Sequence, residues 1–269
     1  MRDGRSAIKQ GQIDILETLY KYRFGSRELI AKALDVNSVT LHKKLAVLIK
    51  HGLVVSRLNG KSKLHGKPVA YFLSPNGLRF LQSLPNHSYI TDSILRGSYR
   101  DKSLAETFID HTLAVFAAIL TLKTMHPSLK AYLRRDMSRF SYFPETPPDA
   151  FLSLTAESGT RRFFLHIISN HQEQQTIFRR ISVYLTYFDE GGWDVTDAEV
   201  PLQLVVCADA RNERKVRRTI KAALNGTDMD NPPDFYTTTQ VALTCVDDAA
   251  LIWTPIDDDE PLSLVDICE

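Results

Sequence analysis

The sequence has few cysteines and no hydrophobic run long enough to cross a bilayer. Its three cysteines, Cys207, Cys245 and Cys268, are odd in number and lack the spacing of metal ligands, so we expect neither a disulfide framework nor a zinc site. The longest hydrophobic run, 111–122, has 12 residues, whereas a membrane-spanning helix needs about 20. The first residues lack the apolar segment of a signal peptide. We therefore expect a cytoplasmic protein that has no membrane partner.

Known signatures of catalysis are also missing. The sequence contains no glycine-rich phosphate loop, no nucleophile elbow, no His-Glu-x-x-His and no closely spaced pair of cysteines. These absences predict that the chain is not an enzyme and binds neither a cofactor nor a metal ion.

Charge is unevenly distributed along a chain whose net charge is only +1. Residues 1–85 contain 15 Lys and Arg against 5 Asp and Glu, a net charge of +10, whereas the remainder contains 18 against 27, a net charge of −9. This asymmetry predicts a basic domain joined to an acidic one. A basic domain attracts nucleic acid, because neutralising phosphates releases their counterions.

Two short helices and a ribbon are predicted between residues 26 and 74. Ser26 is a suitable N-cap for the first helix, and Asn37 or Ser38 for a second helix over 39–51, which Gly52 would end. The second helix has hydrophobic residues at helical spacing: Leu41, Leu45 and Leu48. Two β-prone runs, 53–58 and 68–73, then flank a basic loop.

This order of elements resembles a winged helix-turn-helix domain, whose second helix lies in the major groove. The resemblance predicts DNA contacts from the second helix by Asn37, Ser38, Thr40, His42, Lys43 and Lys44. It predicts further contacts from the ribbon by Arg57, Lys61, Lys63 and Lys67. Two alternatives stay open: Asn37 would use its side chain to cap the helix, and the ribbon would be a solvated hairpin loop.

The expected organisation is a DNA-binding domain over 1–84, a polar linker over 85–102, an α/β domain over 103–246 and a tail over 247–269. The tail holds eight acidic residues and no basic ones, so it is expected to be solvated. The α/β domain would consist of helices 103–125, 173–188 and 213–224 and strands 130–134, 149–154, 162–168, 202–207 and 240–246, with helices on both faces of the sheet. A basic cluster over 211–221 is open to three readings: a solvated face, a phosphate-contacting surface, or a dock for the acidic tail.

The strand after Pro147-Pro148-Asp149, the strand containing Phe-Phe-Leu and the helix ending in Tyr-Leu-Thr-Tyr-Phe resemble the replication-relaxation family of plasmids and mobile elements. The second half of that family is similar to PD-(D/E)xK nucleases, in which carboxylates bind a divalent metal ion. Asp149 matches the family's aspartate, but His166 and Ile168 stand where an acid and a lysine or second acid would follow. The resemblance thus implies a two-domain α+β or α/β chain whose restriction-endonuclease-like domain lacks a complete catalytic motif.

Our leading hypothesis is a sequence-specific protein that binds double-stranded DNA, as a transcription regulator or as an accessory factor in plasmid replication or mobilisation. We expect a homodimer, because helix-turn-helix proteins bind paired half-sites, and a replication or transfer protein as a further partner. Two alternatives are a metal-dependent endonuclease using Asp149, with Glu106 as a second carboxylate, and a protein-interaction module.

Overall fold

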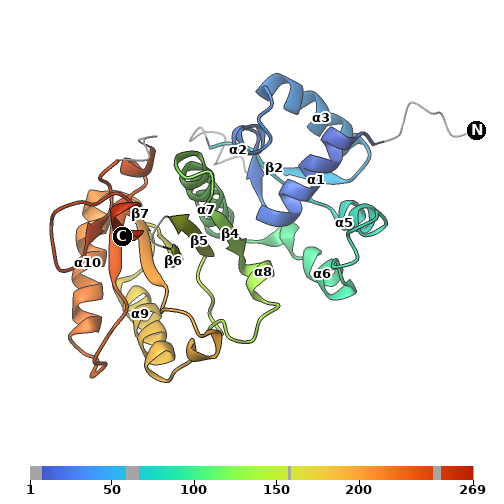
Figure 1. Ribbon diagram of the computed structural model, residues 1–269. Coiled ribbons are helices and arrows are strands. Elements are labelled where there is room, and N and C mark those ends of the chain that lie inside the picture. Colours follow the sequence, from blue (N-terminus) through green and yellow to red (C-terminus); the bar gives the residue numbers. More distant parts are fainter. Residues whose placement is uncertain (1–7, 59–66, 157–158, 245–249, 269) are drawn as a thin grey trace, which may run out of the picture. The chain divides into compact units, whose positions relative to one another are not determined.

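The protein forms two units, each of which combines helices and strands (Figure 1). The computed structural model describes residues 8–58, 67–156, 159–244 and 250–268. Unit 1 comprises residues 1–120, and unit 2 comprises residues 121–269. The expected mixture of α and β structure is confirmed, and the larger of the two sheets contains both parallel and antiparallel pairs.

Unit 1 contains a small antiparallel sheet surrounded by helices. Its helices are α1 (Gln10–Tyr22), α2 (Arg27–Ala33), α3 (Ser38–Lys50), α5 (Pro75–Gln82), α6 (Asp92–Ser98), the 3-10 turn η1 (Asp101–Ser103) and the first part of α7 (Glu106–Met125). Its strands are β1 (Gly25–Ser26), β2 (Val54–Arg57) and β3 (Ala70–Leu73), in the order β1-β3-β2.

Local capping fixes where α2 and α3 begin and end. The Ser26 side chain accepts a hydrogen bond from the Leu29 backbone, as an N-cap does. At the C-terminal end of α3, the backbone N–H of Leu53 donates to the carbonyl of Leu48, and Gly52 has a φ of 66°. This is a Schellman ending, in which a left-handed glycine satisfies the last carbonyls. The chain therefore leaves α3 sharply and enters β2 directly.

The segment 85–102 was expected to be a polar linker, and this description is wrong. It contains α6 and η1, and two of its polar side chains are buried. Asp101 is 4% exposed and accepts two hydrogen bonds from the Arg23 guanidinium, while His87 lies 2.9 Å from Glu17. These contacts attach the segment to α1, so its polarity reflects paired groups rather than exposure.

Helix α7 is 20 residues long and is the one helix among the described residues whose length and composition would suit a membrane span. Such a helix is weak evidence for a membrane span, because a core helix of a soluble protein can have the same length and composition. Phe116 and Ile119 are fully buried, and the first turns carry Glu106 and Asp110 in ion pairs. The helix thus has the contacts of a core helix.

Unit 2 is built on a six-stranded mixed sheet in the order β4-β5-β6-β7-β8-β9. The strands are β4 (Lys130–Leu133), β5 (Ala150–Ala156), β6 (Gly159–Ile168), β7 (Leu202–Cys207), β8 (Phe235–Thr239) and β9 (Thr254–Pro255). β6, β7 and β8 are parallel, and the remaining pairs are antiparallel. The expected strand over 240–246 is wrong, because the Phe-Tyr-Thr-Thr-Thr run before it forms β8 and residues 242–244 form a 3-10 turn.

Two long helices, α9 (Gln174–Asp189) and α10 (Ala210–Leu224), pack against one face of this sheet (Figure 1). Their apolar sides meet Ile168, Val205 and Cys207 in one core cluster. A shorter helix, α8 (Arg134–Met137), follows β4. The side chains of Asp149 and His166 lie on the same face of the sheet and contact Arg180 and Tyr184 of α9.

The acidic end of the chain is packed rather than solvated over its described part, which corrects the expectation of a solvated tail. Trp253 is fully buried, and Ile256 and Leu264 are at most 3% exposed. β9 pairs with β8, and a final 3-10 turn, η4, spans Asp266–Cys268. Hydrophobic side chains between the acidic ones therefore anchor the segment, while the carboxylates stay at the surface.

Candidate nucleic-acid interface

Helix α3 turns its leucines to the core of unit 1 and its polar side to solvent. The three predicted core leucines are at most 1% exposed, which confirms their assignment. Thr40, His42 and Lys43 are exposed, and Ser38 is half-buried. These side chains of the expected contact set share the accessible side of α3, and hydroxyl, imidazole and ammonium groups can all meet base edges or phosphates.

Sequence reasoning missed three residues that lie near the middle of this accessible side. Val39 is 65% exposed, and Ala46 and Lys50 are exposed as well. Together with Lys43 they recur at helical spacing directly opposite the leucines, so the leucine periodicity contained the signal. An exposed valine can contact the methyl group of thymine, which makes Val39 a candidate for base recognition.

Two other predicted contact residues of this region lie against other parts of unit 1. The Asn37 side-chain oxygen accepts a 2.8 Å hydrogen bond from the Val39 backbone, so Asn37 is the N-cap of α3. The Lys44 ammonium rests on the first turn of α1, where a Cβ on Gly11 would lie 2.4 Å from its Nζ. The capping alternative for Asn37 is therefore the observed one.

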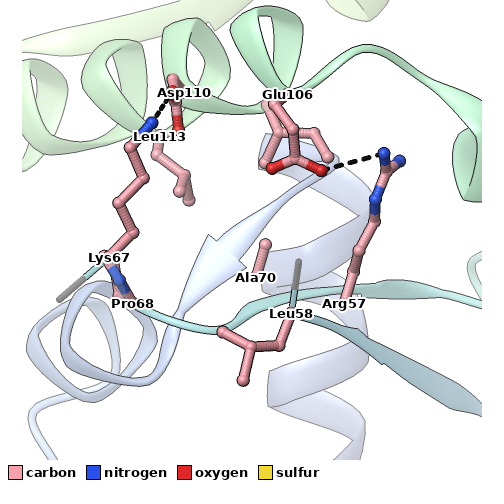
Figure 2. Close-up of a pocket in the computed structure, with 9 residues that line it drawn as sticks. Arg57, Leu58, Lys67, Pro68, Ala70, Glu106, Asp110 and Leu113 are labelled. Atoms are coloured by element: carbon pink, nitrogen blue, oxygen red, sulfur yellow. Dashed lines mark hydrogen bonds and ion pairs between the residues drawn. The ribbon is translucent and has the colours of Figure 1, made fainter. Parts of the chain in front are cut away.

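The two basic residues that flank the loop of the β2–β3 hairpin are paired with α7 (Figure 2). The Arg57 guanidinium lies 3.0 Å from the Glu106 carboxylate, and Arg57 also donates to the backbone carbonyl of Lys102. Lys67, on the opposite arm of the hairpin, pairs with Asp110 one helical turn further along α7. Acidic residues of α7 thus neutralise both arms of the hairpin.

Between these two ion pairs lies a cavity of about 270 Å³ with an apolar lining (Figure 2). The apolar lining consists of Leu58, Pro68, Ala70, Ile109 and Leu113. The hairpin therefore faces α7 through aliphatic side chains, with one ion pair at each side of the cavity. The remaining predicted contacts of the ribbon, Lys61 and Lys63, lie outside the described residues.

In unit 2, Asp149 is buried and bound on both carboxylate oxygens. Its side chain is 1% exposed and lies 3.4 Å from the Arg134 guanidinium and 3.3 Å from that of Arg180. The backbone N–H of Ile167 donates a 2.8 Å hydrogen bond to Oδ2. A buried carboxylate is stable only when it is paired and hydrogen-bonded, and here two arginines supply the positive charge.

His166 lies on the same sheet face and is a neutral core residue. Burial, and next the positive charge of Arg180, lower the pKa of its imidazole to about 3. Its Nε2 lies 2.9 Å from the Gln203 side-chain oxygen, and the Gln203 amide nitrogen donates to the Pro201 carbonyl. Gln203 therefore presents an acceptor to His166, so the imidazole proton resides on Nε2.

Metal-binding and nucleophilic groups do not assemble within the described residues. No group of three or more His, Cys, Asp and Glu side chains in this part of the chain could hold a metal ion. Cys207 and Cys268 are both buried, and burial raises the pKa of the Cys207 thiol, which keeps it protonated. Cys245 lies outside the described residues.

Comparison with known proteins gives no relative from which a role could be transferred. No protein-family model matches the chain, and neither the curated proteins nor the solved structures include a significant match to it.

Proposed function

We propose that this chain is a non-catalytic, sequence-specific protein that binds double-stranded DNA through unit 1. The observation that carries the proposal is the accessible side of α3, which presents Thr40, Lys43 and Lys50 from a region whose net charge is +10. A positively charged helix held firmly on a core, with polar side chains outward, suits the major groove of duplex DNA.

In this proposal, residues 1–84 are a winged helix-turn-helix domain. Helices α2 and α3 correspond to the helix-turn-helix, and the β2–β3 hairpin corresponds to the wing. Phosphate contacts from the hairpin require Arg57 and Lys67 to leave Glu106 and Asp110, or to contact DNA while still paired with them.

We assign unit 2 to a restriction-endonuclease-like scaffold that has no nuclease chemistry. The order of its main elements, β4-β5-β6-α9-β7 with the short helix α8 between β4 and β5, supports this assignment. Hydrolysis by a metal-dependent nuclease requires carboxylates that are open to Mg²⁺. At Asp149 two guanidinium groups lie where a cation would be needed, and the neighbouring His166 is neutral and buried.

The biological role that fits best is transcription regulation, or an accessory function in plasmid replication or mobilisation within the cytoplasm. A homodimer that binds paired half-sites, and a replication or transfer protein as a partner, remain predictions. The resemblance to the replication-relaxation family also remains a prediction, and it is the reason for naming mobile elements.

Selection of binding sites from random duplexes, followed by anisotropy titration, tests the proposal. We expect an enriched sequence whose binding is weakened about 5-fold to 100-fold by Thr40→Ala or Lys43→Gln, since a base contact contributes about 1–3 kcal/mol. Arg96→Gln, an exposed change on α6, is the control and should alter affinity less than about two-fold. The proposal fails if no sequence is enriched, or if Lys43→Gln behaves as the control does.

A nicking assay separates the proposal from the endonuclease alternative. Supercoiled plasmid incubated with the protein and Mg²⁺ or Mn²⁺ should stay intact. Nicking that is lost in Asp149→Asn would overturn the non-catalytic assignment. A stable protein partner without any DNA affinity would instead favour an interaction module.

A further inference from the structure

Helix α10 carries an exposed stripe of basic side chains that the fold does not use. The stripe consists of Arg211, Arg214, Arg218 and Lys221, and all four residues are exposed. Their spacings of three, four and three residues place them on one face of α10 over about 15 Å. We call this set the α10 stripe.

The opposite side of α10 is fixed in the core of unit 2. Val216 and Ile220 are fully buried in the cluster that joins α9, α10 and the sheet. The Asp209 side chain caps the helix by accepting a 2.8 Å hydrogen bond from the Asn212 backbone. The α10 stripe is therefore presented on a rigid platform.

Other charged residues of α10 have partners in unit 2. Lys215 donates to the Gln172 carbonyl, and Arg217 donates to the Pro255 and Asp258 carbonyls and to the Asp259 carboxylate. Arg217 thus holds the acidic C-terminal segment. For this one residue, the reading of the basic cluster as a dock for the acidic tail applies.

Within the stripe, the Arg218 Nε donates a hydrogen bond to the Arg214 carbonyl of the same helix, a contact that does not neutralise its charge. Across residues 8–58, 67–156, 159–244 and 250–268, no ion pair involves any of its four members. Hydrogen bonds from the Asn212 backbone and the Asn170 amide lower the pKa of the nearby Asp209 carboxyl, and Arg211 adds a smaller lowering effect.

This arrangement is unfavourable for the isolated protein. Like charges three or four residues apart on a helix repel each other and destabilise it. Unit 2 has 15 Lys and Arg against 23 Asp and Glu, so acids for pairing are abundant in its composition. Four adjacent basic residues left without them indicate an external anionic ligand.

We infer that the α10 stripe binds the phosphate backbone of duplex DNA. Each strand carries one phosphate per about 3.4 Å of helix axis, so a stripe of about 15 Å spans about four of them. An anionic membrane suits the stripe less well, because a membrane-surface helix also needs an exposed apolar side. The apolar side of α10 is buried in the core cluster.

This inference extends the proposed DNA-binding function to a second surface, and the two can be tested separately. The stripe makes no base contacts in this scheme, so it should contribute equally to any duplex. α3 should instead determine the preference for one sequence. The quantity that reports on the stripe is therefore the salt dependence of binding to a duplex of unrelated sequence.

The experiment measures binding of the full chain to such a duplex between 50 mM and 200 mM salt by anisotropy. Each phosphate contact contributes about 0.9 to the slope of log K against log salt. We expect Arg218→Gln with Lys221→Gln to reduce the magnitude of the slope by about 1.8, and the change of all four residues to reduce it by about 3.6. The matched control is Lys130→Gln with Arg179→Gln, which removes two exposed positive charges elsewhere in unit 2.

Equal slopes for the stripe variant and the control overturn the inference, provided that urea unfolding gives the same midpoint for both. The inference is also overturned if the stripe variant has the same salt slope for DNA as the unsubstituted protein but, unlike that protein, does not bind phosphatidylglycerol vesicles. The ligand would then be a membrane. A Thr40→Ala, Lys43→Gln variant measured in parallel reports on α3 alone. If the α3 variant loses its sequence preference, and the stripe substitutions still reduce the salt slope by the same amount, the two surfaces act independently.

Discussion

The Arg57 guanidinium lies 3.0 Å from the Glu106 carboxylate, which joins the end of β2 to the first turn of α7 (Figure 2). Neither side chain is fully exposed, since Arg57 is 23% and Glu106 is 33% accessible. A second pair, Lys67 with Asp110, repeats this relationship on the other arm of the hairpin. In the proposed function, α7 would therefore compete with DNA phosphates for Arg57 and Lys67.

Neutralising this acidic pair should strengthen DNA binding. In Glu106→Gln with Asp110→Asn, Arg57 and Lys67 lose their carboxylate partners and become available to phosphates. We expect affinity to rise about two-fold to ten-fold at low salt and the salt slope to steepen by about 0.9 per new contact. Anisotropy titrations over a salt series measure both quantities.

The matched control is Asp14→Asn with Asp92→Asn, which removes one half-buried and one exposed negative charge from unit 1 without touching the hairpin. If the control raises affinity as much as the α7 variant does, only the change in net charge matters. In that case the hairpin pairs do not compete with DNA.

Replacing Asp149 should destabilise unit 2 strongly. The change Asp149→Ala leaves Arg180, whose side chain is 15% exposed, without its carboxylate. Breaking a buried charge pair on one side costs about 3–5 kcal/mol. Urea unfolding should show this loss, whereas Asp230→Ala at an exposed position should change the free energy of unfolding by less than about 0.5 kcal/mol. An equally small loss in Asp149→Ala would mean that the arginines do not depend on this carboxylate.

Local sequence patterns predicted much of the secondary structure, because their signals involve near neighbours. The leucine spacing of α3, the cap at Ser26 and the glycine ending at Gly52 are examples of this kind. The two hairpin ion pairs could not be predicted from local patterns, because each joins residues more than 40 positions apart. Charge alone identified Arg57 and Lys67 as free cations, and only the fold brings Glu106 and Asp110 beside them.

Composition misled the predictions where polar residues are buried or apolar residues are widely spaced. The segment 85–102 reads as a linker because Asp101 and His87 are polar, yet Arg23 and Glu17 pair with them inside unit 1. In the acidic segment, isolated residues such as Trp253 form no periodic pattern, although the side chain is fully buried. Both errors arise because pairing across long sequence separations cannot be read from composition.

His166 should make the stability of unit 2 depend on pH below neutrality. Burial lowers the pKa of its imidazole to about 3 in the folded protein, compared with 6.5 for an ordinary histidine. Between these values the unfolded chain binds the proton and the folded chain does not. The stabilisation is therefore complete above about pH 6.5 and is lost as the pH falls toward 3, at up to about 1.4 kcal/mol per pH unit.

Urea unfolding at pH 7.5, 6.0 and 5.0 measures this dependence. The variant His166→Gln should flatten it, because no proton is then taken up on unfolding at this position. His171→Gln, at an exposed histidine, should leave the wild-type slope unchanged. Identical slopes in all three proteins would show that His166 is not responsible.

Arg217 should hold the C-terminal segment to α10. Its guanidinium donates to the carbonyls of Thr254, Pro255, Ile256 and Asp258 and to the Asp259 carboxylate, and the side chain is 13% exposed. Hydrogen bonds to a charged donor contribute about 1.5–3 kcal/mol each, so no neutral side chain can replace the set.

We expect Arg217→Gln to accelerate amide hydrogen exchange across 250–268 by at least about ten-fold, while exchange in β6 and β7 stays slow. Arg218→Gln is a stringent control, because it removes the same charge at the next residue, whose exposed side chain contacts only α10 itself through the Arg214 carbonyl. Equal exchange in the two variants would mean that Trp253 and Ile256 anchor the segment without help from Arg217.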